Sequence, residues 1–114
     1  MTDPVLVGGV SEVRRIAAMA EAYQTPVTMH DCNGPVQFTV GVNLSVHLPN
    51  ATLQESVRAY HRTWYRDLAQ DVAPIDHGLA SPLDTPGHGV ALRPEALEAP
   101  GTRRRRSTAK GIDS

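Results

Sequence analysis

The stretch Pro26-Val27-Thr28-Met29-His30-Asp31-Cys32-Asn33-Gly34-Pro35 decides the fold class of this 114-residue chain. Its second to fourth residues, Val-Thr-Met, suit a short β-strand, and His30 stands where this run gives way to turn residues. Parallel α/β sheets carry their reactive side chains at the carboxyl ends of strands. The stretch therefore predicts an α/β protein with a functional histidine at a strand end.

Two acidic residues occupy similar positions along the chain. Asp3 precedes Gly8-Gly9 and a helical pattern, and Glu55 follows Thr52-Leu53-Gln54, which is typical of a second short strand. The acid, the histidine and the second acid are spaced like successive βα units. They predict a proton-transfer site made of Asp3, His30 and Glu55.

An amphipathic helix is predicted over residues 11–23. Apolar residues recur at helical spacing from Val13 to Ala20 and beyond. Ser11 suits the N-cap position, and Glu12 suits the positive end of the helix dipole.

The segment from residue 36 to residue 48 fits two structures. Every even position is apolar, which favours a half-buried strand or a hairpin around Gly41. A subset of these apolar residues also has the four-residue spacing of a helical stripe: Val36, Val40, Leu44 and Leu48. The residue pattern alone favours the strand.

Composition divides the chain into three regions. Residues 1–70 carry the strand and helix patterns, and residues 71–99 are rich in Pro and Gly and are predicted to be extended. Residues 100–114, with the basic run from Arg103 to Arg106, are predicted to form a disordered tail. The net charge is −1, so the average field attracts neither nucleic acid nor acidic ligands.

The remaining composition narrows the class of protein. A single cysteine, Cys32, excludes an internal disulfide and fits a reducing compartment. The N-terminus has no signal-peptide pattern, and no apolar stretch approaches the ~20 residues that span a bilayer. The five histidines lack the close spacing of a zinc site. We expect a cytoplasmic protein without a membrane or nucleic-acid partner.

Several motifs follow one another in a specific order. They are Asp3-Pro4 with Gly8-Gly9-Val10-Ser11-Glu12 before a helix, Pro26-(x)3-His30, Gly34-Pro35, Gln54-Glu55-Ser56 and Pro86-Gly87-His88-Gly89-Val90. Together they resemble the carboxy-terminal part of the mandelate racemase/muconate lactonizing enzyme family, within the enolase superfamily. The likeness covers about residues 2–95 and is greatest to the sugar-acid dehydratase branch, to which galactonate dehydratase belongs.

The resemblance implies a modified (β/α)-barrel with a separate capping domain. This chain would supply the end of strand six to strand eight and a C-terminal extension, whereas a whole barrel takes roughly 250 residues. It would therefore be a fragment, incomplete as a stand-alone barrel. The family pattern also places a helix after Gly34-Pro35, with Pro35 at the first helical position, so the resemblance favours a helix over residues 36–48.

The resemblance also implies roles for the three candidate residues. His30 matches the base that takes the proton α to a carboxylate, and Asp3 matches the acid that orients this histidine. Glu55 matches the acid that hydrogen-bonds the substrate carboxylate as it becomes an enediolate. The family's Mg²⁺ would stabilise that intermediate. Its ligands belong to strands three to five, which this chain does not contain.

We therefore expect the C-terminal portion of a Mg²⁺-dependent sugar-acid dehydratase, inactive as an isolated chain and a homo-oligomer when complete. Two alternatives stay open. A racemase or epimerase of the same superfamily would use His30 together with an opposed base on an earlier strand. A small non-catalytic module would bind an acidic partner through the Arg-rich tail.

Overall fold

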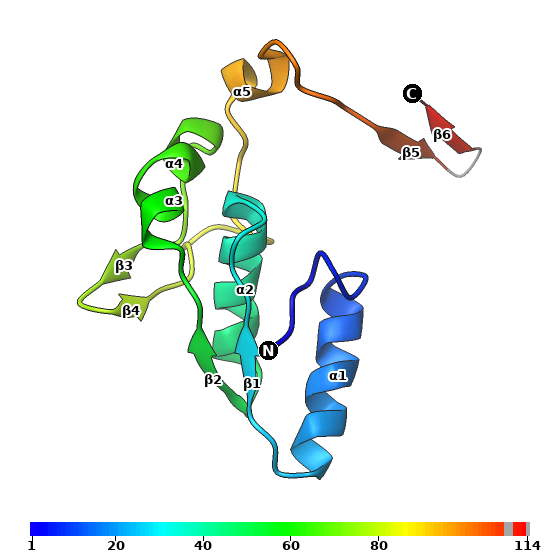
Figure 1. Cartoon of the computed structure of the whole chain (residues 1–114), viewed down its shortest axis with the longest axis vertical. Coiled ribbons are helices and arrows are strands. Elements are labelled where there is room, and N and C mark those ends of the chain that lie inside the picture. Colours follow the sequence, from blue (N-terminus) through cyan, green and yellow to red (C-terminus); the bar gives the residue numbers. More distant parts are fainter. Residues whose placement is uncertain (109–110, 114) are drawn as a thin grey trace.

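The structure is a computed structural model that describes residues 1–108 and 111–113 (Figure 1). Along the chain its elements are α1 (Val10–Ala22), β1 (Val27–Met29), α2 (Pro35–His47), β2 (Ala51–Gln54), α3 (Arg58–Arg62), α4 (Trp64–Leu68), β3 (Ile75–Asp76), β4 (Leu79–Ala80), α5 (Pro94–Glu98), β5 (Arg106–Thr108) and β6 (Gly111–Asp113). None of the helices in this described part is long and apolar enough to cross a membrane.

The centre of the structure is the βαβ unit β1–α2–β2, in which β1 and β2 pair in parallel. Thr2 adds a parallel bridge to Met29 of β1. Its N–H donates to the Thr28 carbonyl and its carbonyl accepts from the His30 N–H, both at 2.9 Å. Parallel strands need a crossover connection, which α2 supplies here, and both strands therefore end at the same edge of the sheet. The prediction of an α/β protein is confirmed.

Helix α1 begins one residue earlier than predicted, and its N-cap is Gly9 rather than Ser11. This corrects the predicted cap. Gly8 and Gly9 both have positive φ angles, 101° and 107°, which only glycine adopts readily. The chain therefore turns into the helix before Ser11, which lies inside the first turn.

The first core cluster forms where α1 and α2 pack on β1. Its buried residues are Val13, Ala17, Val27, Met29, Leu44 and Leu48. Burial of this apolar surface stabilises the βαβ unit and fixes the positions of the strand ends.

The segment of residues 36–48, whose pattern fitted both a strand and a helix, forms the helix α2, as the family resemblance implied. Its apolar residues form two stripes, each with four-residue spacing. Val40 and Leu44 pack in the first cluster, whereas Phe38 and Val42 pack with Tyr65 and neighbouring residues in a second cluster. The two stripes are offset by two residues, so together they imitate the alternation of a strand. The helix is buried on two sides, so each apolar stripe packs in its own cluster.

Residues 71–99 are largely irregular apart from the short β3–β4 hairpin and α5. Residues 109, 110 and 114 of the predicted disordered tail lie outside the described residues. Elsewhere in the tail the structure differs from the prediction, because β5 and β6 pair antiparallel. The β-branched residues Thr108 and Ile112 favour extended backbone. The prediction of disorder rested on the composition of the tail and did not take this preference into account.

Candidate active site

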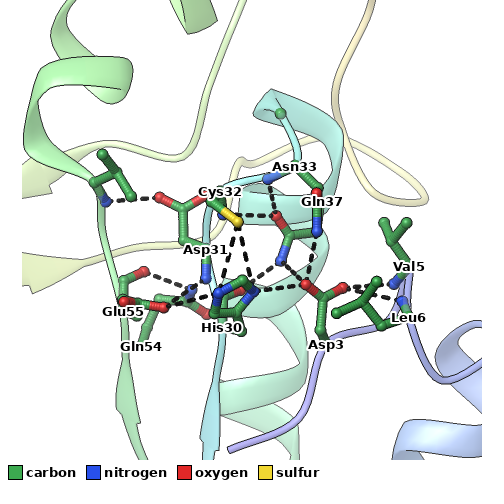
Figure 2. Close-up of polar contacts among 12 residues, drawn as sticks. Asp3, Val5, Leu6, His30, Asp31, Cys32, Asn33, Gln37, Gln54 and Glu55 are labelled. Carbon is green, nitrogen blue, oxygen red and sulfur yellow. Dashed lines mark hydrogen bonds and ion pairs between the residues drawn. The ribbon is translucent and has the colours of Figure 1, made fainter.

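The three predicted residues meet at the carboxyl edge of the parallel strands (Figure 2). His30 directly follows β1, Glu55 directly follows β2, and Asp3 directly follows the bridging residue Thr2. His30 Nδ1 lies 2.7 Å from Asp3 Oδ2, and His30 Nε2 lies 3.7 Å from Glu55 Oε2. The parallel pairing therefore brings both acids to opposite nitrogens of one imidazole ring.

The Asp3 carboxylate is buried and surrounded by donors. They are the N–H groups of Val5 (2.7 Å) and Leu6 (3.3 Å) on Oδ1, and His30 Nδ1 (2.7 Å), Asn33 Nδ2 (2.8 Å) and Gln37 Nε2 (3.3 Å) on Oδ2. Burial raises the pKa of Asp3, but hydrogen bonds from His30, the two backbone N–H groups and Asn33 outweigh it, so this pKa lies below its ordinary value. Asp3 is therefore ionised at neutral pH.

The ionised Asp3 sets the state of the His30 ring. A carboxylate can only accept hydrogen bonds, so this contact places the proton of a neutral His30 on Nδ1. The lone pair is then on Nε2, on the side of Glu55. The His30 side chain is about a quarter exposed (27%), so the ring is partly open to solvent. The arrangement can accept a proton at Nε2 and stabilise the resulting charge from both sides.

A buried polar network holds the Glu55 side of the site. The Asp31 N–H donates to Glu55 Oε2 at 3.0 Å. The Asp31 side chain accepts from the Tyr65 hydroxyl at 2.6 Å and from the Val57 N–H at 2.8 Å. Burial, followed by the hydrogen bond to Asp31, raises the pKa of the Tyr65 hydroxyl, which stays a donor. Helix α4 is thus connected to the ends of both strands.

Cys32 lies against the His30 ring. Its Sγ is 3.6 Å from Nε2 and 3.9 Å from Nδ1. Partial desolvation, then the charges of Asp3, Asp31 and Glu55, raise the pKa of this thiol. The thiol therefore stays protonated at neutral pH and does not compete with His30 as a base.

Sequence reasoning missed the supporting residues Asp31, Asn33, Gln37 and Tyr65. The first two belong to the strand-end stretch, where proximity to His30 was a usable signal. Gln37 occupies a polar position of the alternating segment and so looked like a solvent-facing residue, although it is buried. Tyr65 belongs to an aromatic stretch whose contacts depend on the fold.

The described residues do not form a metal site. Residues 1–108 and 111–113 contain no group of three or more His, Cys, Asp or Glu side chains placed to hold a metal ion. The Asp3 carboxylate is already occupied by five donors. The residues present therefore do not fit a Mg²⁺ site of their own.

A parallel βαβ unit with an acid–base pair at its carboxyl edge defines the class: an α/β protein with a site suited to proton transfer. Residues 1–96 match the enolase C-terminal domain-like family, and the chain belongs to this family, which confirms the resemblance to the mandelate racemase/muconate lactonizing enzymes of the enolase superfamily.

Individual relatives agree with this assignment. The chain is 36% identical over 96 residues to a D-gluconate dehydratase from Thermoproteus tenax, covering 84% of this chain and 19% of that protein. It is 34% identical over 95 residues to a D-galactonate dehydratase from Verminephrobacter eiseniae, covering 79% and 25%. A solved mandelate racemase subgroup enolase from Agrobacterium tumefaciens matches with a TM-score of 0.74 and 44% identity, covering 80% and 25%. The chain thus spans about a quarter or less of the length of these relatives.

Proposed function

We propose that this chain forms the end of strand six to strand eight of a sugar-acid dehydratase barrel, which removes the proton α to a carboxylate. The observation that carries the proposal is the 2.7 Å contact between His30 Nδ1 and Asp3 Oδ2 at the carboxyl edge of β1, with Glu55 on the other side of the ring. The names of the two dehydratase relatives support the substrate class.

Each residue has a defined part in this reaction. His30 takes or delivers the α-proton at Nε2, because Asp3 holds the other nitrogen as a donor. Asp3 stays ionised and stabilises the imidazolium that forms. Glu55, whose Oε2 lies 3.7 Å from Nε2, hydrogen-bonds the substrate carboxylate as its charge increases.

The enolase superfamily chemistry uses Mg²⁺ to stabilise the doubly charged intermediate. The described part of this chain holds no site for the ion. In the proposal its ligands therefore lie on barrel strands outside this chain. We expect the 114-residue chain alone to show no dehydratase activity, with or without added Mg²⁺.

A hybrid barrel tests the proposal. Residues 1–96 replace the corresponding segment of the Thermoproteus tenax D-gluconate dehydratase, and release of the dehydrated 2-keto product from gluconate, galactonate and xylonate is measured. We expect the hybrid to dehydrate at least one of these acids, and H30N to lower kcat by about 10²–10⁴-fold. A folded hybrid whose activity survives H30N would refute the role of His30.

The same hybrid separates the dehydratase from its alternative. A racemase or epimerase exchanges the Cα hydrogen with solvent without losing water. Deuterium incorporation at Cα of recovered substrate, with no keto product, would replace the dehydratase proposal by the racemase one.

A further inference from the structure

Gln37 makes a set of contacts that the proposed reaction does not yet use. It lies in the first turn of α2, and its side chain is buried. Its Nε2 donates to Asp3 Oδ2 at 3.3 Å and to the His30 carbonyl oxygen. Its Oε1 accepts from the N–H groups of Cys32 (3.3 Å) and Asn33 (2.9 Å). Figure 2 shows this amide beside the contact between His30 and Asp3.

These contacts fix the orientation of the amide. A primary amide has two N–H donors and two acceptor lone pairs, and all four are used here. Exchanging the nitrogen and the oxygen would set the NH₂ group against two backbone N–H groups. It would also set the oxygen against a carboxylate and a carbonyl. Only one orientation therefore satisfies the buried group.

We propose that Gln37 is a positioning residue: its amide holds the Asp3 carboxylate against His30 Nδ1 and so keeps the lone pair of His30 on Nε2. The proposal rests on the proposed function, in which Nε2 is the reacting atom. One side chain binds both members of the pair, Asp3 through its carboxylate and His30 through its backbone. A rotation of either relative to the other would break a bond to the same amide.

A purely structural role for Gln37 would lead to a different result. A glutamine in the third position of a helix commonly accepts hydrogen bonds from N–H groups just before the helix. The Oε1 contacts to Cys32 and Asn33 are of this kind. Such capping needs only the oxygen of Gln37, whereas positioning of Asp3 needs the nitrogen. A substitution that keeps the first and removes the second separates the two roles.

The substitution Q37E meets this requirement, because glutamate keeps the acceptor oxygen but at alkaline pH has no donor for Asp3. Q37L removes both. Q54E is the matched control: Gln54 lies at the end of β2, where it hydrogen-bonds Ser45 and the Glu55 carbonyl rather than the acid–base pair. It adds the same charge near the site.

The readout is the tautomer of His30, measured by long-range ¹H–¹⁵N NMR on the 114-residue chain at alkaline pH. His61 serves as an internal check of folding, because its buried Nε2 lies 3.0 Å from the Ala73 carbonyl oxygen. We expect the Nδ1–H form of His30 to dominate in the native chain and in Q54E. We expect the ratio of Nδ1–H to Nε2–H forms to fall about two- to tenfold in Q37E and Q37L.

Each contrary result overturns the proposal. If His30 keeps its native tautomer in Q37E while the His61 signals are unchanged, Gln37 is a capping residue only. If both Q37E and Q37L lose the His61 signature, Gln37 is a structural residue. A native chain without a dominant Nδ1–H form also overturns it. None of these results depends on turnover, so an inactive hybrid barrel would refute the proposed function without changing them.

Discussion

Replacing Asp3 by asparagine removes the charge on which the site geometry depends. The asparagine has one acceptor oxygen in place of two. If this oxygen stays with the N–H groups of Val5 and Leu6, the new NH₂ group faces three donors, including His30 Nδ1. His30 can then avoid a donor–donor contact only by moving its proton to Nε2. D3N therefore inverts the tautomer and removes the base.

The size of the effect follows from the lost contacts. The shorter contacts to Asp3 Oδ2 come from His30 (2.7 Å) and Asn33 (2.8 Å), and the longer one from Gln37. A hydrogen bond to a charged group contributes about 1.5–3 kcal/mol, less where water can replace it. Because the His30 and Asn33 side chains are partly accessible, we expect D3N to lower the free energy of unfolding by about 2–3 kcal/mol.

The pH dependence of this difference has a definite sign. The pKa of Asp3 in the folded chain lies below its ordinary value of 3.8. Its stabilising contribution is therefore fully present above the pKa of the unfolded chain and is lost as the pH falls through the lower folded value. The stability gap between the native chain and D3N should therefore close in acid, as the Asp3 carboxylate of the folded chain takes up its proton.

Urea unfolding followed by the fluorescence of Trp64, the single tryptophan, measures this gap. NMR of the His30 ring nitrogens measures the tautomer in the same samples. The reasoning is refuted if D3N is as stable as the native chain near neutral pH, or if His30 keeps its proton on Nδ1 in D3N.

Other parts of the structure give further predictions. G34A should lower the free energy of unfolding by about 1–3 kcal/mol through backbone strain alone. Gly34 has a φ of 120°, and a Cβ added there meets nothing within 4 Å. Urea unfolding measures the loss of stability, and no loss would contradict the positive φ of Gly34. Y65F should lower the free energy of unfolding by about 1–3 kcal/mol, because the buried Asp31 carboxylate loses a hydrogen-bond donor. Y60F is the control, and equal effects of the two substitutions would contradict the role of the Tyr65 hydroxyl in the network. Adding EDTA should leave the melting temperature of the chain unchanged because the described residues hold no metal site, and a fall would contradict this.

The sequence predicted the residues at the strand ends better than it predicted the residues that hydrogen-bond to them. Asp3, His30 and Glu55 are at the predicted edge because short strands that alternate with helices leave few other arrangements. The structure of α2 was ambiguous from periodicity because its two buried stripes sum to a period of two. The family resemblance, which places a helix after Gly34-Pro35, favoured the helix that the structure shows. Gln37 could not be found from sequence, since its burial depends on the site that it helps to build.

The Cys32 thiol lies beside His30, so its reactivity reports on the charges around this histidine. The sequence has one cysteine, so an alkylating reagent attaches at one place, 3.6 Å from His30 Nε2. Its labelling rate follows the thiolate fraction, which partial desolvation and then the three neighbouring carboxylates keep low by raising the pKa of the thiol. D3N removes the largest of these charge effects, so a stopped-flow trace should show faster labelling of Cys32 in D3N than in the native chain.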